Sequence, residues 1–366
     1  MLPSSRRIKL AAALLGTCGL LYLVAFADLW VPLEEYSPII SNSDDQILAI
    51  LNSTFASITN TSAVNLTSAP IDAFKPQDSK LPFCPVMPPD LIGKVPVHLD
   101  GPNMTVIESL YPDVEAGGHG HPKECKSRHR VAIIVPYRDR DHHLRIFLHN
   151  LHGFLAKQQV DYGIFIVEQI ANQTFNRAKL MNVGFAEAMK VYDFQCFIFH
   201  DVDLLPEDDR NLYYCPEQPR HMSVAIDKFK YKLPYESIFG GISAMTRQHV
   251  ERINGFSNDY WGWGGEDDDL ATRVHANGFK ISRYSGEVAR YKMIKHEKEK
   301  SNPINPCRFS LMRRTRSRFR HDGISNLKYE VVSALRMPLY TIIRVDLLEA
   351  ESRKQLHEES RLFKTC

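Results

Sequence analysis

The stretch of this chain best suited to chemistry is a run of four acidic residues, Glu266 to Asp269, which directly follows Trp261-Gly-Trp263-Gly-Gly. Adjacent carboxylates repel one another, which costs free energy unless a cation, a ligand or a reaction uses the charge. Glycine lets a ligand come close, and tryptophan offers a flat apolar face, so this pattern suits a sugar ring that stacks and donates its hydroxyls to acids. The alternative is an acidic first turn of a helix over Asp267–Ala276, which the helix dipole favours. Both interpretations can hold together.

A second acidic pair follows an apolar segment, because Phe197-Ile-Phe-His leads directly into Asp201-Val-Asp203. In open α/β sheets, ligands bind at the carboxyl ends of the strands. Carboxylates there suit a hard divalent cation that holds phosphates. A lone pair of this spacing also arises by chance, so a surface turn is the alternative.

Two further polar clusters follow predicted strands. Pro136-Tyr-Arg-Asp-Arg140 comes after the first strand, where Arg138 and Arg140 could pair with phosphate in a bidentate manner. Phe175-Asn-Arg-Ala-Lys179 follows the second strand and offers an aromatic ring, an amide and basic groups. Each cluster alone is a weak signal, but three clusters after three successive strands predict a nucleotide-binding cleft.

The elements that must position these residues alternate between strand and helix. Apolar runs predict buried strands, and apolar residues at helical spacing predict amphipathic helices. This alternation predicts an α/β fold with a parallel sheet. The expected strands are 130–136, 162–167 and 196–199, with weaker candidates at 221–227 and 279–283; the expected helices are 143–155 and 178–190, and the charged tail 345–366 is prone to form a helix.

The N-terminus predicts a membrane anchor. Arg6, Arg7 and Lys9 precede a nearly uninterrupted apolar run over 10–26, which is about the minimum length for a spanning helix. Basic residues before the span place the remainder of the chain in the lumen. Cleavage as a signal peptide near 25–27 is the alternative. We therefore expect a cytosolic tail (1–9), a signal anchor (10–28), a flexible glycosylated stem (29–80) and a lumenal catalytic domain (81–366).

A lumenal chain should carry glycans and disulfides. Five asparagines lie in N-x-S/T sequons and are expected to be glycosylated: Asn52, Asn60, Asn65, Asn103 and Asn172. Of the seven cysteines, Cys18 lies in the expected span, and the other six allow 15 pairings in an oxidising compartment.

Charge and histidine patterns add little. The net charge of +2 favours no particular partner. Five arginines lie within 313–320; because a lumenal protein meets no nucleic acid, a solvated or phosphate-facing surface is expected there. His119, His121, His142 and His143 lack a regular ligand spacing and are expected at the surface.

Together these motifs resemble those of the β1,4-galactosyltransferase family, inverting glycosyltransferases that are Golgi type II membrane proteins. The resemblance covers about residues 125–340 and implies a GT-A type nucleotide-sugar transferase domain with a Rossmann-like sheet. The motifs that carry it are Pro136-Tyr-Arg-Asp-Arg140, Phe175-Asn-Arg-Ala-Lys179, Asp201-Val-Asp203, Phe239-Gly-Gly241, the string from Trp261 to Asp269, and Met293-Ile-Lys-His296.

The resemblance implies residue roles. Asp267 is the implied catalytic base, and Mn²⁺ is the implied cofactor, held by Asp203, Met293 and His296. A thioether is a soft ligand for a hard ion, so Met293 depends on the resemblance alone. The implied donor-binding residues are Pro136, Arg138, Arg140, Phe175, Arg177, Asp201, Val202, Asp203, Lys228, Ile238, Gly241 and Trp263. The implied acceptor-binding residues are Gly265, Glu266, Asp267, Asp268, Arg308 and Phe309, and the implied disulfides are Cys84–Cys125 and Cys196–Cys215.

One position departs from the pattern of the vertebrate galactosyltransferases. They carry a tyrosine immediately before Phe239-Gly-Gly241, where this chain has Ile238. In the family this side chain contacts the donor sugar at C2, and a smaller aliphatic residue leaves room for a 2-acetamido group. The resemblance therefore implies UDP-GalNAc as the donor, although Ile238 could instead be a core residue.

The expected function is that of an inverting transferase which moves GalNAc from UDP-GalNAc to O4 of a terminal β-GlcNAc on glycoproteins or glycolipids. The alternatives are a β1,4-galactosyltransferase that uses UDP-Gal and an inactive, lectin-like lumenal protein. The set of Asp203, Asp267 and His296 argues against the last. The expected partners are the UDP-sugar, a GlcNAc-terminated acceptor and the Golgi membrane, with a homodimer as an option and no nucleic acid.

Overall fold

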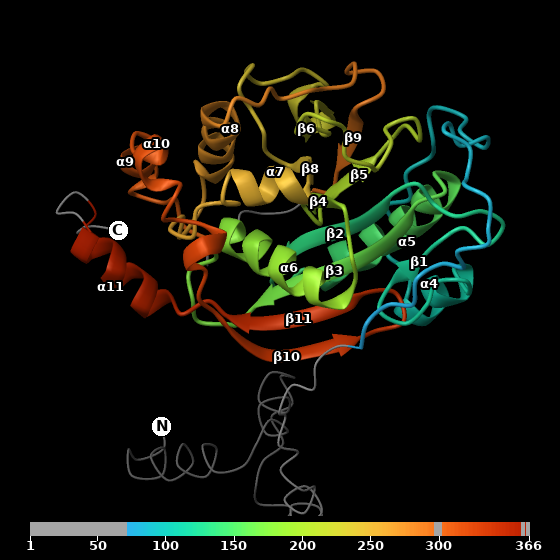
Figure 1. Cartoon of the computed structure of the whole chain (residues 1–366), viewed down its shortest axis with the longest axis horizontal. Helices are drawn as coiled ribbons and strands as arrows, with labels where there is room; N and C mark the ends of the chain where they lie inside the picture. The colour runs from blue at the N-terminus through green and yellow to red at the C-terminus, as the bar shows by residue number, and fades with distance from the viewer. Residues whose placement is uncertain (1–71, 296–301, 360–362, 364–366) are drawn as a thin grey trace, which may run out of the picture. The chain divides into compact units, whose positions relative to one another are not determined.

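The structure is a computed structural model that describes residues 72–295, 302–359 and 363. A mixed β-sheet forms its centre, and Figure 1 shows helices on both sides of this sheet. Within the described residues the sheet has eight strands in the order β10-β11-β3-β2-β4-β8-β6, and β1 pairs with β3 beside this path. The strands are β1 (His119–Gly120), β2 (Arg130–Tyr137), β3 (Asp161–Gln169), β4 (Cys196–His200), β6 (Arg220–His221), β8 (Ile242–Thr246), β10 (Glu330–Arg336) and β11 (Thr341–Asp346).

The expected α/β fold is confirmed, but the sheet is not all parallel. Strands β11, β3, β2 and β4 run parallel, whereas β8, β6, β10 and β1 pair antiparallel to their neighbours. Parallel strands that follow one another in the chain need a long crossover. Helix α5 (Asp141–Lys157) connects β2 to its neighbour β3, and α6 (Arg177–Val191) connects β3 to β4, on the other side of β2. The short connection 337–340 between β10 and β11 allows only an antiparallel hairpin.

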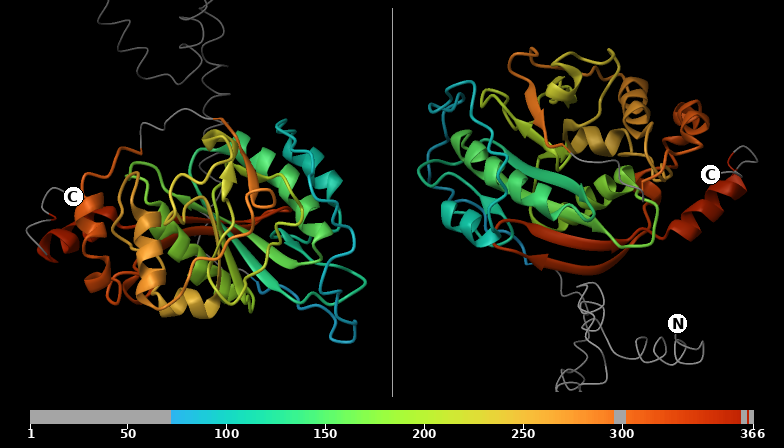
Figure 2. Two further views of the ribbon diagram at one scale, coloured as in Figure 1. Left: turned by 90° about the horizontal axis from the view of Figure 1, so that it is seen from above. Right: turned by 180° about the vertical axis from the view of Figure 1, so that it is seen from behind.

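The central strands are apolar throughout because both faces of the sheet are covered. In β2, Val131, Ile133 and Val135 pack into the same cluster as residues of α5. Ala132 and Ile134, which alternate with them, pack with residues of α6. Figure 2 shows the two helices from two further directions. The strands are therefore held between two helical layers, and their carboxyl ends stay fixed in space.

Several of the remaining elements lie near the carboxyl ends of the central strands, whereas α4 (Met104–Leu110) and α7 (Arg247–Arg252) lie near their amino ends. A second sheet has the order β5-β9-β7. These strands are β5 (Leu204–Pro206), β7 (Ala225–Ile226) and β9 (Arg290–Met293). The other helices are α4, α7, α8 (Glu266–Ala276), α9 (Arg308–Met312), α10 (Thr315–Arg318) and α11 (Glu349–Glu359), with 3₁₀ turns at Asp227–Phe229 and Ile324–Asn326.

Three element predictions need correction. The strand candidate 221–227 is divided between β6 and β7. The candidate 279–283 forms no strand, because only Ser282 makes a single bridge to Arg220, while the guanidinium of Arg283 is held by the carbonyls of Glu236 and Ile238. The tail expected to be helical begins inside β11, and among its described residues the α-helix covers only α11.

His119 was expected at the surface but is buried. Its Nε2 lies 2.8 Å from Asp161 Oδ1 and its Nδ1 lies 3.3 Å from Glu115 Oε2. Its ring stacks on Phe74 with 4.4 Å between the ring centroids, and the amide of Phe74 donates to the carbonyl of Val191. Residue 74 falls in the range assigned to the stem, so the packed core already includes chain before residue 81.

Both implied disulfides are confirmed, since Cys84 is bonded to Cys125 and Cys196 to Cys215. Cys307 is also disulfide-bonded. Asn103 and Asn172 are exposed, as glycosylation requires, whereas Asn52, Asn60 and Asn65 lie outside the described residues. No helix in the described part of the chain has the length and hydropathy to cross a membrane, and the expected anchor 10–28 lies outside that part.

A buried ion network fixes helix α8 to its surroundings. The guanidinium of Arg273 is fully buried and donates to Asp269 Oδ2 at 2.6 Å and to Asp322 Oδ2 at 3.0 Å. Asp269 also accepts a hydrogen bond from Thr315 of α10 at 2.5 Å. Because Asp269 belongs to the first turn of α8, this network sets the orientation of the acidic turn.

We predict that Arg273→Met lowers the free energy of unfolding by about 3–5 kcal/mol, because it leaves the buried carboxylate of Asp269 without a cation and leaves Asp322 only the longer contact with Arg318. The matched control is Arg344→Met, which removes an exposed ion pair with Glu168 and should cost no more than about 1 kcal/mol. Urea unfolding of both variants measures the difference. Equal losses in the two variants would contradict this role for Arg273.

Candidate active site

A pocket opens where the carboxyl ends of β2 and β4 meet the first turns of α6 and α8. Its walls combine basic, acidic and aromatic side chains with two glycines. The lining residues are Pro136, Arg138, Arg140, Phe175, Arg177, Asp201, Val202, Asp203, Gly240, Gly241, Trp263, Glu266, Asp267 and Asn302. The three polar clusters predicted to follow successive strands therefore meet in one cavity.

Topology brings these residues together from distant parts of the sequence. Strand β4 ends at His200, so Asp201 and Asp203 follow it directly. Strand β8 pairs antiparallel with β4, which brings Gly240 and Gly241 beside that end, and the amide of Asp201 donates to the carbonyl of Gly241. Gly265 precedes α8 with a φ of 93°, a conformation that glycine adopts without strain.

Arg177 connects the two acidic clusters. Its Nε lies 2.6 Å from Asp201 Oδ1, and its Nη1 lies 3.8 Å from Glu266 Oε1. Its Nη2 also donates to the carbonyl of Gly241 at 3.2 Å. On the opposite wall, the guanidinium carbon of Arg138 lies 5.0 Å from the ring centroid of Phe175, which is a cation–π arrangement.

Three carboxylates in or beside this pocket, those of Asp201, Glu266 and Asp268, hold protons more tightly than usual. Burial, opposed by Arg177 and reinforced by Asp203, raises the pKa of Asp201 to about 6. Burial and the neighbouring Asp267 raise the pKa of Glu266 to about 7. The same two causes raise the pKa of Asp268. Carboxylates that repel one another in this way would be stabilised by a cation or by donors from a ligand.

The carboxylate of Asp267 lies directly against Gly240. A Cβ placed on Gly240 would lie 2.4 Å from Asp267 Oδ2, so only glycine fits at this position without displacing the carboxylate. The other oxygen of Asp267 accepts the amide of Asp268 at 2.9 Å. Asp267 is thus held at the N-terminus of α8 with one oxygen directed to the glycine turn.

The implied metal ligands are only partly described. Strand β5 pairs with β9 so that Leu204 opposes Met293, and the amide of Ile294 donates to the carbonyl of Asp203 at 2.8 Å. Asp203 and Met293 are therefore neighbours, but His296 lies outside the described residues. Among the residues described, no three His, Cys, Asp or Glu side chains are arranged to hold a metal. The carboxylates of Asp201 and Asp203 nevertheless fit a hard divalent cation.

Several implied site residues do not line this pocket. Arg308 begins α9 near Gly264 and Gly265, and its guanidinium carbon lies 4.7 Å from the ring centroid of the exposed Phe309. Lys228 is exposed. Ile238 is half-buried and contributes its backbone carbonyl to Arg283. The implied residues outside the lining are Lys228, Ile238, Gly265, Asp268, Met293, Arg308 and Phe309.

Three residues of the site were missed from the sequence. Gly240 and Asn302 line the pocket, and the hydroxyl of Tyr235 bonds to Asp268. The two glycines before β8 offered a signal for Gly240, since they lie in a matched motif. Asn302 and Tyr235 lie in segments without periodicity or motif, and only the folded chain brings them to the acidic turn.

Trp263 is exposed and is held through its backbone. Its amide donates to the carbonyl of Pro303 at 2.7 Å, and its carbonyl accepts from the amide of Asn305 at 3.0 Å. Its side chain is 61% exposed. The indole therefore projects from a fixed backbone at the mouth of the pocket, where it can cover a ligand.

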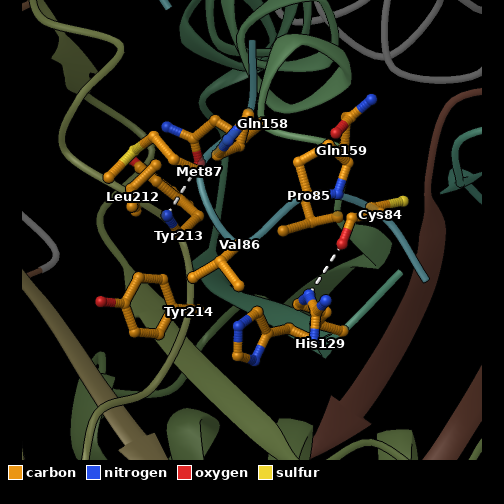
Figure 3. A pocket seen from close by; sticks show the side chains of 13 residues that line it. Cys84, Pro85, Val86, Met87, His129, Gln158, Gln159, Leu212, Tyr213 and Tyr214 are labelled. Atoms are coloured by element: carbon orange, nitrogen blue, oxygen red, sulfur yellow. Dashed lines mark hydrogen bonds between the residues drawn. The ribbon is translucent and has the colours of Figure 1, made fainter. Parts of the chain in front are cut away.

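A second pocket, shown in Figure 3, lacks this chemistry. It lies beside the amino end of β2, where Arg128 Nε donates to the carbonyl of Cys84. Its lining is largely apolar and includes Pro85, Val86 and Met87. None of its lining residues is an Asp or Glu, so it offers no carboxylate as a base or cation ligand.

Comparisons with known proteins agree with this geometry. Residues 84–216 match the model for the N-terminal region of glycosyl transferase group 7, and residues 220–297 match a galactosyltransferase domain model. Beta-1,4-galactosyltransferase 3 of Mus musculus is 49% identical over 285 residues, 77% of this chain and 72% of that protein. Beta-1,4-galactosyltransferase 2 of Mus musculus is 46% identical over 303 residues, 80% of this chain and 82% of that protein.

Solved structures show the same fold. The catalytic domain of Drosophila beta1,4-galactosyltransferase 7 in complex with xylobiose matches with a TM-score of 0.52 and 34% identity, covering 60% of this chain and 94% of that one. A mutant of that enzyme in complex with manganese, UDP-Gal and xylobiose matches with a TM-score of 0.51 and 33% identity, over the same shares of the two chains. The expected GT-A-like α/β fold is therefore confirmed.

We predict that Gly240→Ala lowers transferase turnover by about 10²-fold, because the added methyl group displaces the Asp267 carboxylate and misplacements of about 1 Å have effects of this size. Gly286→Ala is the control, since its new Cβ would make an ordinary contact of 3.5 Å with Ala225. Steady-state kinetics of the two variants provide the measurement. Wild-type turnover in Gly240→Ala would show that Asp267 tolerates the displacement.

Glu266 should make the stability of the metal-free protein depend on pH. Its pKa is about 7 in the fold against 4.5 ordinarily, so the folded state retains a proton that the unfolded chain has lost. The contribution of Glu266 to the free energy of unfolding is therefore highest below about pH 4.5 and falls as the pH rises to about 7. In the presence of chelator, the Tm of Glu266→Gln should fall by fewer degrees between pH 5 and 7.5 than the Tm of wild type. Each kcal/mol of lost stability lowers Tm by about 2–4 °C. The same pH slope in both proteins would contradict this.

Proposed function

The chain belongs to the β1,4-galactosyltransferase family of glycosyltransferase group 7, and on this basis we propose that it transfers galactose or N-acetylgalactosamine from the UDP-sugar to O4 of a terminal β-GlcNAc, with inversion at the anomeric carbon. One observation carries the proposal. The pocket holds Asp267 at the N-terminus of α8 and the Asp201–Asp203 pair at the end of β4. A base on one side and cation ligands on the other are what a single displacement needs.

In this mechanism Asp267 accepts the proton from the acceptor O4 as that oxygen attacks the donor. The carboxylate is aimed by its bond to the amide of Asp268 and by the glycine turn at Gly240. Glu266, Asp268, Arg308 and Phe309 bind the acceptor sugar, and Gly265 lets it approach the backbone. Tyr235 supports this side through its bond to Asp268.

The opposite wall binds the nucleotide. Phe175 stacks with the base, and Arg138, Arg140 and Arg177 neutralise charge on the diphosphate. Asp203, together with Met293 and His296, would hold Mn²⁺, which when bound neutralises charge on the departing UDP. Trp263 covers the donor and excludes water.

The donor sugar has two candidates. The curated relatives are named galactosyltransferases, and a related structure contains UDP-Gal, so UDP-Gal has the better support. UDP-GalNAc is the second candidate because Ile238 occupies the position where the vertebrate galactosyltransferases carry a tyrosine. An isoleucine there would admit a 2-acetamido group that a tyrosine would crowd.

We further propose that the enzyme is a type II protein of the Golgi membrane, anchored by residues 10–28 and separated from the membrane by a glycosylated stem. The apolar run and the sequons support this arrangement. The disulfides Cys84–Cys125 and Cys196–Cys215 agree with an oxidising lumen.

The test is transfer to a GlcNAc-terminated oligosaccharide with manganese and either UDP-Gal or UDP-GalNAc. Asp267→Asn should lower turnover by at least about a hundredfold and leave donor binding largely intact, because the amide keeps the size but not the basicity of the carboxylate. The control is Asp90→Asn, which alters an exposed residue. Full turnover by Asp267→Asn, or by wild type in excess chelator, would refute the proposed mechanism.

Ile238→Tyr should change the choice of donor. Whichever donor the wild type prefers, this substitution should raise the ratio of kcat/KM for UDP-Gal over UDP-GalNAc by about 10- to 200-fold, since a tyrosine crowds the acetamido group. The KM for the acceptor should stay near the wild-type value. An unchanged ratio would show that Ile238 does not contact the donor, and the transferase assignment would remain.

A further inference from the structure

The arginine-rich segment 313–320 has two parts with different roles. Arg318 is buried and pairs with Asp259 at 2.5 Å and with Glu359 at 2.8 Å. The guanidinium carbon of Arg314 lies 5.6 Å from the ring centroid of Phe363. Arg314 and Arg318 therefore stabilise the fold through these contacts. They account for only two of the five arginines in this segment.

The other three arginines face solvent. Arg313, Arg316 and Arg320 are exposed, and among the described residues none of them makes an ion pair within 4 Å. His321 beside them is exposed as well. We call Arg313, Arg316 and Arg320 the arginine surface.

The neighbouring acids do not neutralise this surface. Asp322 is buried and bound by Arg273, and Arg318 also approaches it. Asp259 and Glu359 are engaged by Arg318. The positive charge of the arginine surface is therefore exposed to solvent, where it attracts anions that come near it.

The arginine surface lies next to the acidic turn. Thr315, between two of the segment's arginines, donates to Asp269 at 2.5 Å, and Asp269 is only two residues from Asp267. Helices α9 and α10 both pack against α8, and Figure 1 shows them beside that helix, outside the central sheet. The segment that carries the arginine surface is therefore packed against the helix whose first turn is proposed to bind the acceptor.

We propose that the arginine surface binds carboxylate groups on the molecule that carries the terminal GlcNAc. This inference rests on the proposed function, because it concerns the acceptor of the same site. Guanidinium groups bind carboxylates through paired hydrogen bonds. Charges at the rim of a site act mainly on encounter and on salt dependence, so the arginine surface selects acidic acceptors without taking part in the transfer.

The test uses one GlcNAc-terminated glycan on three carriers, with the full-length chain in neutral detergent. The first carrier is a neutral peptide, the second a peptide rich in Asp and Glu, and the third a neutral peptide whose glycan has a second antenna ending in sialic acid. At low salt, KM for one or both acidic acceptors should be about three- to tenfold below that of the neutral one, as expected of a few exposed ion pairs. The second and third carriers identify whether the anion belongs to the peptide or to the glycan.

The decisive variant is Arg313→Glu/Arg316→Glu/Arg320→Glu. It should abolish the advantage of the acidic acceptors and its dependence on salt, with kcat and the KM for the neutral acceptor unchanged. The control Lys75→Glu/Lys80→Glu/Lys94→Glu makes the same change in net charge at exposed positions elsewhere and should keep the advantage. If the triple variant proves unstable, the single variant Arg316→Gln is the mildest substitute. It should lose part of the advantage in KM that the acidic acceptors have with wild type.

The outcomes separate the two proposals. If wild type uses none of the three acceptors, the proposed function fails. If it uses all three with equal KM, or if the arginine variant keeps the preference, only the present inference fails. The arginine variant could instead bind mixed micelles containing phosphatidylserine more weakly than wild type does, with no change in KM for any acceptor. That result would show that the arginine surface binds the membrane, and it would overturn the proposal.

Discussion

Four carboxylates, those of Asp201, Asp203, Glu266 and Asp267, line one partly buried pocket, and their mutual repulsion is the constraint on which the surrounding structure depends. The guanidinium of Arg177 partly neutralises this repulsion, because it contacts Asp201 and approaches Glu266. The N-terminal end of α8 further stabilises negative charge. Burial and the neighbouring acids still raise the pKa values of Asp201 and Glu266, and a bound divalent cation would stabilise their charged forms.

The scaffold keeps these charges apart and fixed. Asp201 and Asp203 extend from a strand that is covered on both faces, so they cannot move without disturbing the core. The acidic turn belongs to α8, which Arg273 and Thr315 hold through Asp269. Donor-side and acceptor-side acids are thus anchored in different layers, and a substrate that binds between them would meet groups already in position.

In the proposed function, donor choice and acceptor choice depend on different parts of this fold. Ile238 precedes β8 on the side of the glycine turn, whereas α9 and α10 extend from the acidic turn on the other side. A change at one place should therefore leave the other largely unaffected.

The sequence by itself determined the three polar clusters, the acidic turn and the central strand–helix alternation, because these depend on local patterns: an apolar run followed by acids, or helical spacing of apolar residues. It gave no account of Asn302, Tyr235 or the antiparallel strands, and it misplaced His119 at the surface. Only the tertiary structure decided these, since each depends on a partner far along the chain, such as Asp161 and Phe74 for His119 and β11 for β10. A contact between distant residues leaves no periodicity in the chain, so packing alone decides it.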